Sequence, residues 1–566
     1  MSALVTPPAP RTVRKPHLQI ETQQLCPTTG GVMHEEKRVV EIGSTLTPRD
    51  IADVALGHAT VSVDWPLVGG RLTRARALVE DALSAGLPTY GVNRGLGPLR
   101  NSEIPRELVA DFQRYVIVSH AAAIGAPLSR IEGRAALLAR LNTLASGASG
   151  VSEGVFVGLL TLLRHDVIPV IPDQGSVGAG DLSQLAAIGQ VLLGLGRAWL
   201  PGRHEMVSGS EALRVAGLEP LQLAAKDSLA LVGSNALSVA TAALTQRRAT
   251  LIAERADLVA ALTLEALAAN LSPYDAAALA ARPHPGQQAS GRRIRTALAG
   301  GDLSSGHRSA SSIQDPLSLR TVPQVHGALL DQLEQLEQML VIELNCAPDN
   351  PFLDLERGIF VSNGNFSITN LAVAFDALRI GLAHVAKLAE RRVALLVSQL
   401  RQGLPLIDQV RAVAASVGYV TPVILAQTAS SLVAQAKHAS APISLAGTTV
   451  GDGLEDASSM AYSSVRLTEQ VLTVVEQLLA VEALLATAVI SAHAGQAVLG
   501  APVERLRLAI VEATERTQET SEVVDWVIEA LRRAGRGDDP TEMRPPIIPA
   551  PITVHDQEVA RHDQLH

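Results

Sequence analysis

Helical periodicity over long stretches is the feature that most constrains this chain. In residues 371–400, the apolar side chains Phe375, Leu378 and Leu382 recur at three- and four-residue spacing, the pattern of one buried face of an α-helix. Residues 465–490 are apolar almost all round, as expected for a helix at the centre of a bundle. The apolar faces of such helices must be covered by other helices. The sequence therefore predicts a mainly α protein built around a large central helical bundle.

The N-terminal part of the chain carries the few strand patterns, at residues 38–42 and 61–63. Between them, Thr47, Pro48 and Asp50 follow the order of an N-cap, a first helical residue and a capping-box carboxylate. A helix is expected to begin there. We therefore expect a small mixed α and β region ahead of the bundle.

The composition fits a large aliphatic core and excludes several classes of protein. Of the 566 residues, 47% are hydrophobic but only 2% are aromatic, and an abundance of alanine and leucine favours helix over strand. The formal net charge of −9, without an extended basic patch, argues against nucleic-acid or anionic-membrane binding. Only Cys26 and Cys346 are present, far apart, so neither a disulfide framework nor a metal site is expected.

One apolar stretch raises the question of a membrane span. Residues 483–503 contain no Asp, Glu, Lys or Arg, but they include Thr487, Ser491 and Gln496. These polar residues favour a buried core helix over a membrane span. The N-terminus has basic residues but no apolar core of a secretory signal. We therefore expect a soluble, cytoplasmic protein.

Changes in composition along the chain suggest four segments. Residues 1–37 are rich in Pro, Thr and charge without periodicity, and we expect a disordered extension. Residues 38–230 would form the N-terminal part, and residues 231–535 the long-helix bundle. Residues 536–566 are Pro-rich and then polar, as in a surface tail.

The most informative motif is in residues 168–187, IPVIPDQGSVGAGDLSQLAA. It resembles the histidine and aromatic amino-acid ammonia-lyases, whose corresponding run reads Gly-Ser-Val-Gly-Ala-Ser-Gly-Asp-Leu. The resemblance extends over about residues 38 to 530, through separate motifs in the same order. It implies a helical bundle of the fumarase/aspartase-like type. It also implies a homotetramer whose active sites draw on three subunits.

The chain lacks one residue of that motif. In the family, the Ala-Ser-Gly segment cyclises and dehydrates into 4-methylideneimidazole-5-one, and the serine β-carbon becomes its electrophilic methylidene. Here the segment is Gly178-Ala179-Gly180, one residue short, and Ala179 has no hydroxyl to eliminate. We therefore expect no such prosthetic group and no other cofactor.

Two further positions depart from the family pattern. The asparagine that hydrogen-bonds the prosthetic group corresponds to Gly233, and Asn235, two residues later, is expected to face another direction on a helix. In the run Gln314-Asp315-Pro316-Leu317-Ser318-Leu319-Arg320, the family's catalytic tyrosine corresponds to Leu317. The missing serine, asparagine and tyrosine all belong to the catalytic mechanism that uses the prosthetic group in the family.

Residues of the proton-transfer and binding machinery remain. Tyr90, in a glycine-flanked loop, corresponds to the family's general base, and glycines permit a lid to close. A free tyrosine titrates near 10, so a base at neutral pH needs a nearby positive charge or dipole. Arg94 either supplies that charge or points to solvent. Arg320 corresponds to the clamp on the substrate carboxylate, a task suited to a planar two-pronged donor.

Four other residues complete the expected site by resemblance. His120, in a Ser-His segment, either helps to recognise the substrate or is a structural hydrogen-bonding residue. Asn350 is expected to orient polar groups, Phe366 to form a pocket wall, and Glu455 to contact the substrate's side chain or amine.

Three functions remain open. The first is a lyase-type enzyme that uses Tyr90 to remove a proton from a small carboxylate-bearing, amino-acid-like substrate, followed by elimination, isomerisation or cyclisation without the electrophile. The second is an inactive homologue that binds a ligand or partners an active paralogue. The third is a conventional histidine or aromatic amino-acid ammonia-lyase.

Overall fold

The computed structural model describes residues 37–401, 422–493, 497–516 and 519–534. Strand β1 begins at Arg38, where the second of two compact units of the chain also begins. The two predicted tails lie outside the described residues, apart from Lys37. The boundary predicted near residue 230 stays a prediction.

The N-terminal region has the predicted mixed structure. Strand β1 (Arg38–Ile42) pairs in parallel with β2 (Ala59–Val63), and α1 (Pro48–Ala55) lies between them in sequence. The Thr47 side chain accepts from the backbone N–H of Asp50, whose carboxylate in turn accepts from the backbone N–H of Thr47. The predicted capping box is confirmed.

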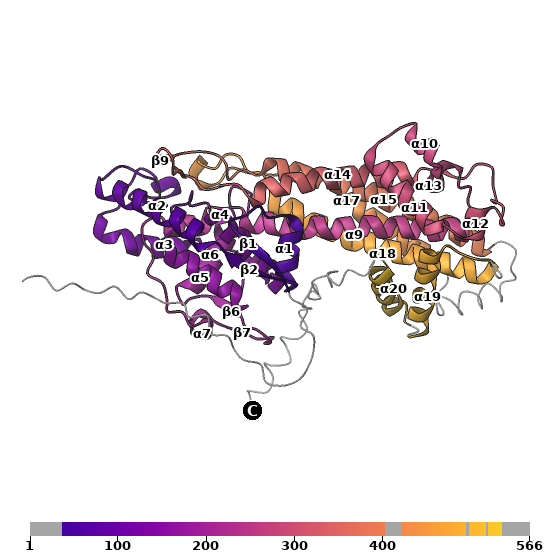
Figure 1. Ribbon diagram of the computed structural model, residues 1–566, viewed down its shortest axis with the longest axis horizontal. Helices are drawn as coiled ribbons and strands as arrows, with labels where there is room; N and C mark the ends of the chain where they lie inside the picture. The colour runs from indigo at the N-terminus through magenta and orange to yellow at the C-terminus, as the bar shows by residue number, and fades with distance from the viewer. Residues whose placement is uncertain (1–36, 402–421, 494–496, 517–518, 535–566) are drawn as a thin grey trace, which may run out of the picture. The chain divides into compact units, whose positions relative to one another are not determined.

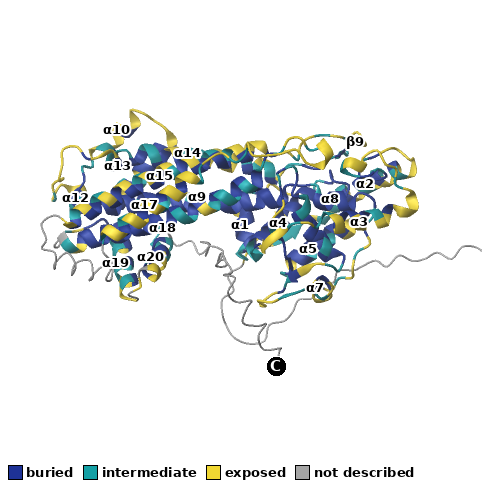
Figure 2. Cartoon of the chain, turned by 180° about the vertical axis from the view of Figure 1, so that it is seen from behind, coloured by how far each residue is buried: buried dark blue, intermediate teal, exposed yellow. Residues whose placement is uncertain are grey.

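Long helices form the core of the described structure, as Figure 1 shows. They are α9 (Ala236–Ala266), α14 (Val322–Leu344), α15 (Thr369–Arg401), α17 (Pro422–His438) and α18 (Ala461–His493). Helix α18 packs along α9, α15 and α17, and α14 packs against α9 and α15. Most residues of α9 and α18 are buried (Figure 2). The predicted mainly α fold with a central bundle is confirmed.

The remaining helices and strands do not belong to this group of core helices. The helices are α2 (Trp65–Ser84), α3 (Val109–His120), α4 (Arg130–Leu144), α5 (Glu153–Arg164), α6 (Leu182–Leu192), α7 (Gly209–Ala216), α8 (Asp227–Val232), α10 (Ala276–Ala280), α11 (Pro285–Leu298), α12 (Asp302–Ser305), α13 (Leu317–Arg320), α19 (Ala501–Glu515) and α20 (Thr520–Ala534). The strands are β3 (Ile124–Pro127), β4 (Ile168–Pro169), β5 (Pro172–Gln174), β6 (Arg197–Trp199), β7 (Met206–Ser208), β8 (Phe352–Asp354) and β9 (Ile359–Val361). Strand β3 pairs with β5, β6 with both β4 and β7, and β8 with β9, all antiparallel.

Charged groups inside the bundle are paired across helices. Arg392 of α15 donates to both carboxylate oxygens of Glu482 on α18, at 2.6 and 2.9 Å, and both side chains are fully buried. Thr263 of α9 donates to the same carboxylate at 2.7 Å. Because a buried charge without partners is costly, this cluster fixes the register of three long helices.

The single helix expected over residues 483–503 is wrong. Helix α18 ends at His493 and α19 begins at Ala501. Two helical segments, Asp227–Ala266 and Ala461–Ala492, are long and apolar enough to cross a membrane, but they are mostly buried inside the protein. Their apolar character is explained by their place in the core.

Candidate functional site

The shortened motif forms a tight loop between β5 and α6. Gly178 and Gly180 adopt positive φ angles of 83° and 91°, a region that favours glycine. Ala179 between them forms an isolated bridge with Ser367, just before α15. The loop thereby lies at the N-terminal end of α15.

Hydrogen bonds from two distant segments hold this loop. The backbone N–H of Gly180 donates to Asn235 Oδ1 at 3.1 Å, and Ser459 Oγ donates to the carbonyl of Gly178 at 2.9 Å. The N–H of Met460 donates to the carbonyl of Val177 at 2.9 Å. A Cβ at Gly178 would lie only 2.2 Å from Ser459 Oγ, so the fit requires glycine.

Asp181 anchors the end of the loop. Its fully buried carboxylate accepts from Ser176 Oγ at 2.7 Å, and from Ser238 Oγ and N–H at 2.6 and 2.8 Å. Burial raises the pKa of Asp181 above its ordinary value, although the hydrogen bonds from Ser238 and Ser176 oppose that rise. The interaction ties the loop to the first turn of α9.

The expected orientation of Asn235 is wrong. Gly233 ends α8 and Asn235 precedes α9, so Asn235 lies in a break between two helices. In that break its Oδ1 faces Gly180, and its Nδ2 donates to the carbonyl of Phe366. Asn235 therefore supplies the amide contact to the loop that sequence reasoning assigned to the position of Gly233.

The loop residues do not fit the family's prosthetic group. That group takes its methylidene carbon from a serine side chain, and the middle residue here is Ala179. Gly178 and Gly180 lie on either side of it as in the family segment, but no residue of Gly178-Ala179-Gly180 carries a hydroxyl. No step through that group is derived for this chain.

Tyr90 lies in a loop that packs against the same end of the bundle. Its hydroxyl accepts from the N–H of Gly97 at 3.0 Å. Gln113 of α3 joins this loop to α8, because its Nε2 donates to the carbonyl of Gly91 and its Oε1 accepts from Ser228 Oγ at 2.6 Å. The loop is therefore fixed to the helix that leads to Asn235.

The electrostatic surroundings of Tyr90 oppose its ionisation within one chain. Burial raises the pKa of Tyr90 above its ordinary value, and the charge of Glu455 raises it further. The Gly97 hydrogen bond and the charge of Arg100 lower it. Within one chain, Arg100 and the Gly97 hydrogen bond do not offset burial, so Tyr90 needs a further positive charge to act as a base at neutral pH.

Arg94 has a different partner from the one considered in its catalytic interpretation. Its guanidinium Nη1 lies 3.1 Å from the carboxylate of Glu103, which is largely exposed. Tyr90 and Arg94 share a backbone bridge, but the arginine is not among the charges that lower the tyrosine pKa. The catalytic role of Arg94 stays a prediction.

Glu455 lies near Tyr90. Glu455 and Val450 exchange two backbone hydrogen bonds around a short turn. That turn contains η4 (Gly451–Gly453), which packs against η1 (Gly97–Leu99) at the end of the tyrosine loop. The structure thus brings the predicted base and the predicted acidic binding residue together.

His120, Asn350 and Phe366 lie on segments at this end of the bundle. His120, the last residue of α3, donates from Nδ1 to the carbonyl of Val116 at 2.8 Å. Asn350 Oδ1 accepts from the N–H of Asn363 at 3.0 Å, and Phe366 uses its carbonyl to bind Asn235. These contacts are structural, and the substrate-binding roles of the three side chains stay predictions.

Arg320 lies far from this group within one chain. Helix α13, which ends at Arg320, packs near the far part of α15, where Arg392 Nη1 donates to the carbonyl of Ser318 at 3.4 Å. At the α-helical rise, Arg392 is about 35 Å from Thr369, the start of α15. Figure 1 shows α13 and α3 at opposite ends of the long helices. A single chain does not bring Arg320 to Tyr90.

The guanidinium of Arg320 holds one acceptor with both of its terminal nitrogens. With its amide turned over, Gln314 accepts from both terminal nitrogens of Arg320, at 2.8 and 3.2 Å. Arg320 Nε is buried without a hydrogen-bond partner among the described residues. Leu317, in place of the family's tyrosine, is 59% exposed.

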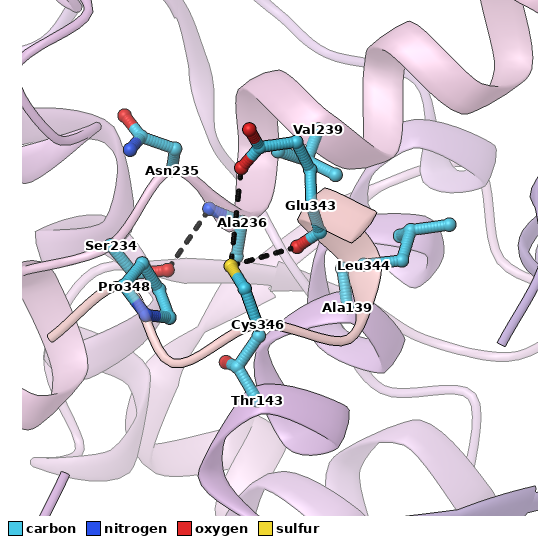
Figure 3. A pocket seen from close by; sticks show the side chains of 10 residues that line it. All are labelled: Ala139, Thr143, Ser234, Asn235, Ala236, Val239, Glu343, Leu344, Cys346 and Pro348. Carbon is cyan, nitrogen blue, oxygen red and sulfur yellow. Dashed lines mark hydrogen bonds between the residues drawn. The ribbon is translucent and has the colours of Figure 1, made fainter. Parts of the chain in front are cut away.

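The sequence did not indicate a small pocket that is lined by Asn235, Glu343 and Cys346 (Figure 3). Cys346 Sγ lies 3.3 Å from the carbonyl of Glu343 and 3.9 Å from its carboxylate. Burial raises the pKa of the Cys346 thiol to about 12, and burial also raises the pKa of Glu343. Such a thiol is not an activated nucleophile, and a lone cysteine in the sequence gave no indication of these surroundings.

A buried charge cluster on the other side of α8 was also missed. Lys226 is fully buried and donates to the carbonyl of Ser149 at 2.7 Å. Nearby, Arg140 of α4 pairs with Asp349 at 2.8 Å. Burial lowers the pKa of Lys226 to about 8. Among the described residues, no group of three His, Cys, Asp or Glu side chains is arranged to hold a metal ion.

Comparisons with known proteins agree with this architecture. The family described as aromatic amino acid lyase matches residues 46–512. Histidine ammonia-lyase of Anaeromyxobacter sp. (strain K) is 39% identical over 489 residues, which cover 85% of this chain and 94% of the relative. Histidine ammonia-lyase of Myxococcus xanthus is 37% identical over 453 residues, covering 79% and 87% of the two chains.

Solved structures give the same result. Histidine ammonia-lyase from Trypanosoma cruzi superposes with a TM-score of 0.78 at 30% identity, covering 88% of this chain and 93% of that one. Tyrosine aminomutase from Streptomyces globisporus gives a TM-score of 0.79 at 28% identity, covering 88% and 97%. The bundle, the glycine loop with its supporting amide and the tyrosine loop therefore place the chain in the histidine and aromatic amino-acid ammonia-lyase family.

Proposed function

We propose that the protein is a lyase-type enzyme for a small carboxylate-bearing, amino-acid-like substrate, and that it works without the prosthetic electrophile. Tyr90 removes a proton from a carbon of the substrate, and the electron pair left on that carbon forms a double bond as a leaving group departs. In an isomerisation, the same pair instead accepts a proton. In a cyclisation, it forms a ring bond to an unsaturated carbon of the substrate, whose π pair then takes up a proton. The observation that carries the proposal is the retained pair of Tyr90 and Glu455, together with a Gly178-Ala179-Gly180 segment that lacks the precursor serine.

The missing electrophile limits which reactions are accessible. Ammonia is a poor leaving group, and the β-proton of an amino acid is weakly acidic. An electrophile that captures the amine or ring stabilises the transition state of deamination, and its loss removes most of that stabilisation. A substrate with a better leaving group, or a more acidic proton, does not need it.

The proposed site is completed by a second copy of the chain. Arg320 of one copy would bind the substrate carboxylate beside Tyr90 of another, because the two residues lie at opposite ends of one subunit. Its positive charge would also favour the phenolate of Tyr90. We further propose a homotetramer, in the cytoplasm, without a nucleic-acid or membrane partner.

Conventional deamination is the second candidate. It is favoured by relatives named histidine ammonia-lyase that are 37–39% identical over most of the chain. The third candidate, an inactive homologue that binds a ligand or partners an active paralogue, is disfavoured by the retained base and its glycine-flanked loop.

The intact mass of the purified protein separates the first two candidates. The proposal expects the calculated mass and no added ultraviolet absorbance. A variant with serine inserted between Ala179 and Gly180 is the positive control, because it restores the Ala-Ser-Gly order and is expected to lose two waters. A wild-type mass lower by two waters would favour conventional deamination.

Proton abstraction is tested directly in deuterium oxide. L-Histidine, L-phenylalanine, L-tyrosine and a panel of substituted amino acids are incubated with the enzyme, and carbon-bound deuterium and products are followed by NMR. We expect exchange or product formation that Tyr90→Phe abolishes and Tyr115→Phe preserves, since Tyr115 is 60% exposed on α3. Binding without exchange or product for every substrate would support the inactive homologue.

A further inference from the structure

A second pocket lies where α9, α11 and the start of α19 meet. Its volume is about 420 Å³, which falls in the range of small-molecule sites. It is lined by Glu254, Asp257, Leu258, Arg292, Arg293, Thr296, Ala297 and Pro502. None of the residues considered above for catalysis or substrate binding lines it. Along α9 it lies about 30 Å from the glycine loop.

A buried carboxylate lies beneath this pocket. Asp257 is 1% exposed, and its Oδ1 accepts from Ser290 Oγ at 2.6 Å and from His326 Nδ1 at 2.9 Å. Its Oδ2 has no hydrogen-bond partner among the described residues and is closed off from solvent. A buried carboxylate oxygen without a hydrogen bond is costly, so the negative charge of Asp257 favours a positive group beside it.

Arginines face this carboxylate. Arg293 Nη1 lies 3.6 Å from Asp257 Oδ2, beyond hydrogen-bond distance, and also has no hydrogen-bond partner among the described residues. Arg293 Nη2 donates to Glu254 Oε1 at 3.0 Å. Arg292 is exposed at the rim. The pocket thus presents two carboxylates and two guanidinium groups, whose formal charges cancel.

We propose that this pocket binds an aliphatic α-amino acid as a zwitterion. The ammonium group donates to Glu254, and the carboxylate accepts from Arg292 and Arg293 in the planar geometry that guanidinium favours. Leu258, Ala297 and Pro502 form an apolar wall for the side chain. The site is separate from the proposed active site and does not depend on its chemistry.

Calorimetric titration of the full-length protein tests this assignment. L-Leucine is compared with 4-methylpentanoate, which lacks the ammonium group, and with 3-methylbutylamine, which lacks the carboxylate. We expect L-leucine to bind at least tenfold more tightly than either analogue, because each analogue leaves one pair of charged groups unsatisfied. Equal binding of all three would overturn the proposal.

Variants locate the binding. Arg293→Gln and Glu254→Gln are each expected to weaken L-leucine binding at least tenfold. Arg282→Gln, which removes an exposed arginine outside the pocket, is expected to leave it unchanged, as is Arg320→Gln. Loss of binding in Arg320→Gln but not in Arg293→Gln would overturn the proposal, because it would place the ligand at the proposed active site. Asp257→Asn serves only as a supporting variant, because the Asp257 carboxylate also accepts a hydrogen bond from His326, so the effect of this change is not confined to the pocket.

Discussion

Replacing Glu265 by glutamine is expected to stabilise the protein above neutral pH and to leave it unchanged in mild acid. Glu265, on α9, is 1% exposed, and neither carboxylate oxygen has a hydrogen-bond partner among the described residues. Within the described part of the chain, its one ion pair is long, 3.9 Å to Arg308 Nη1. Burial raises the pKa of Glu265 to about 7, opposed by Arg308 and aided by Asp302.

The size and sign of the effect follow from linkage. Between an ordinary pKa of 4.5 and a folded pKa of about 7, the folded state holds a proton that the unfolded state has released. Stability therefore falls as pH rises through this window, by up to ~3 kcal/mol. Glutamine has no such proton. For a chain of this length, ~3 kcal/mol corresponds to a melting-temperature shift of about 3 °C.

Paired calorimetric melts at pH 5 and pH 8 provide the measurement. We expect Glu265→Gln to match the wild type at pH 5 and to melt about 3 °C higher at pH 8. Glu482→Gln is the matched control, because Glu482 is equally buried but paired with Arg392. That variant should melt lower at both pH values, since it leaves an uncompensated buried charge. A shift of Glu265→Gln that does not depend on pH would refute the reasoning.

Two further variants test the buried groups around the glycine loop. Lys226→Met should be more stable than the wild type at pH 7 and lose that advantage as pH approaches 10.5, because the folded pKa of Lys226 is about 8 and the buried ammonium is destabilising below it. Melting temperatures of both proteins are compared at the two pH values, and a difference between them that does not change with pH would contradict the prediction. Gly178→Ala should destabilise by roughly 2–3 kcal/mol, since its Cβ would meet Ser459 Oγ at 2.2 Å. Gly202→Ala, also at positive φ but with open space around it, should cost about 1 kcal/mol, and equal melting temperatures for the two variants would contradict the steric argument.

Local rules predicted much of the fold. The capping box at Thr47 and the helical period of residues 371–400 depend on neighbours three or four residues apart, and α1 and α15 appear where those patterns lie. The strand at residues 38–42 also formed as predicted, because its pattern of β-branched residues is local. These elements needed no knowledge of tertiary contacts.

The predictions that failed depended on a break or on a distant partner. Asn235 was expected to follow helical geometry from Gly233, but α8 ends there and the side chain turns towards Gly180, 55 positions earlier in the chain. The stretch expected to form one helix over residues 483–503 is divided between α18 and α19. Apolar composition indicates that a segment is buried, but it does not indicate whether the helix is continuous, so it could not predict this interruption.

The sequence named candidate site residues, whose roles stay predictions, but it did not indicate how they are arranged. Tyr90 and Glu455 come together as a motif-based reading expects, whereas nothing local indicates that Arg94 pairs with Glu103. The position of the buried Asp257 carboxylate likewise depends on Ser290 and His326, which lie on two other helices. Contacts of this kind arise from helix packing and leave no periodic trace in the sequence.

The distance between Tyr90 and Arg320 along one chain has a genetic consequence if sites form between copies. A chain with Tyr90→Phe still contributes an intact Arg320 to a site on its neighbour, and a chain with Arg320→Gln still contributes an intact Tyr90. Mixing the two inactive proteins through dissociation and reassembly would then create sites that are whole, about a quarter of them in a random equal mixture. Each inactive allele would complement the other, although neither polypeptide carries a complete site.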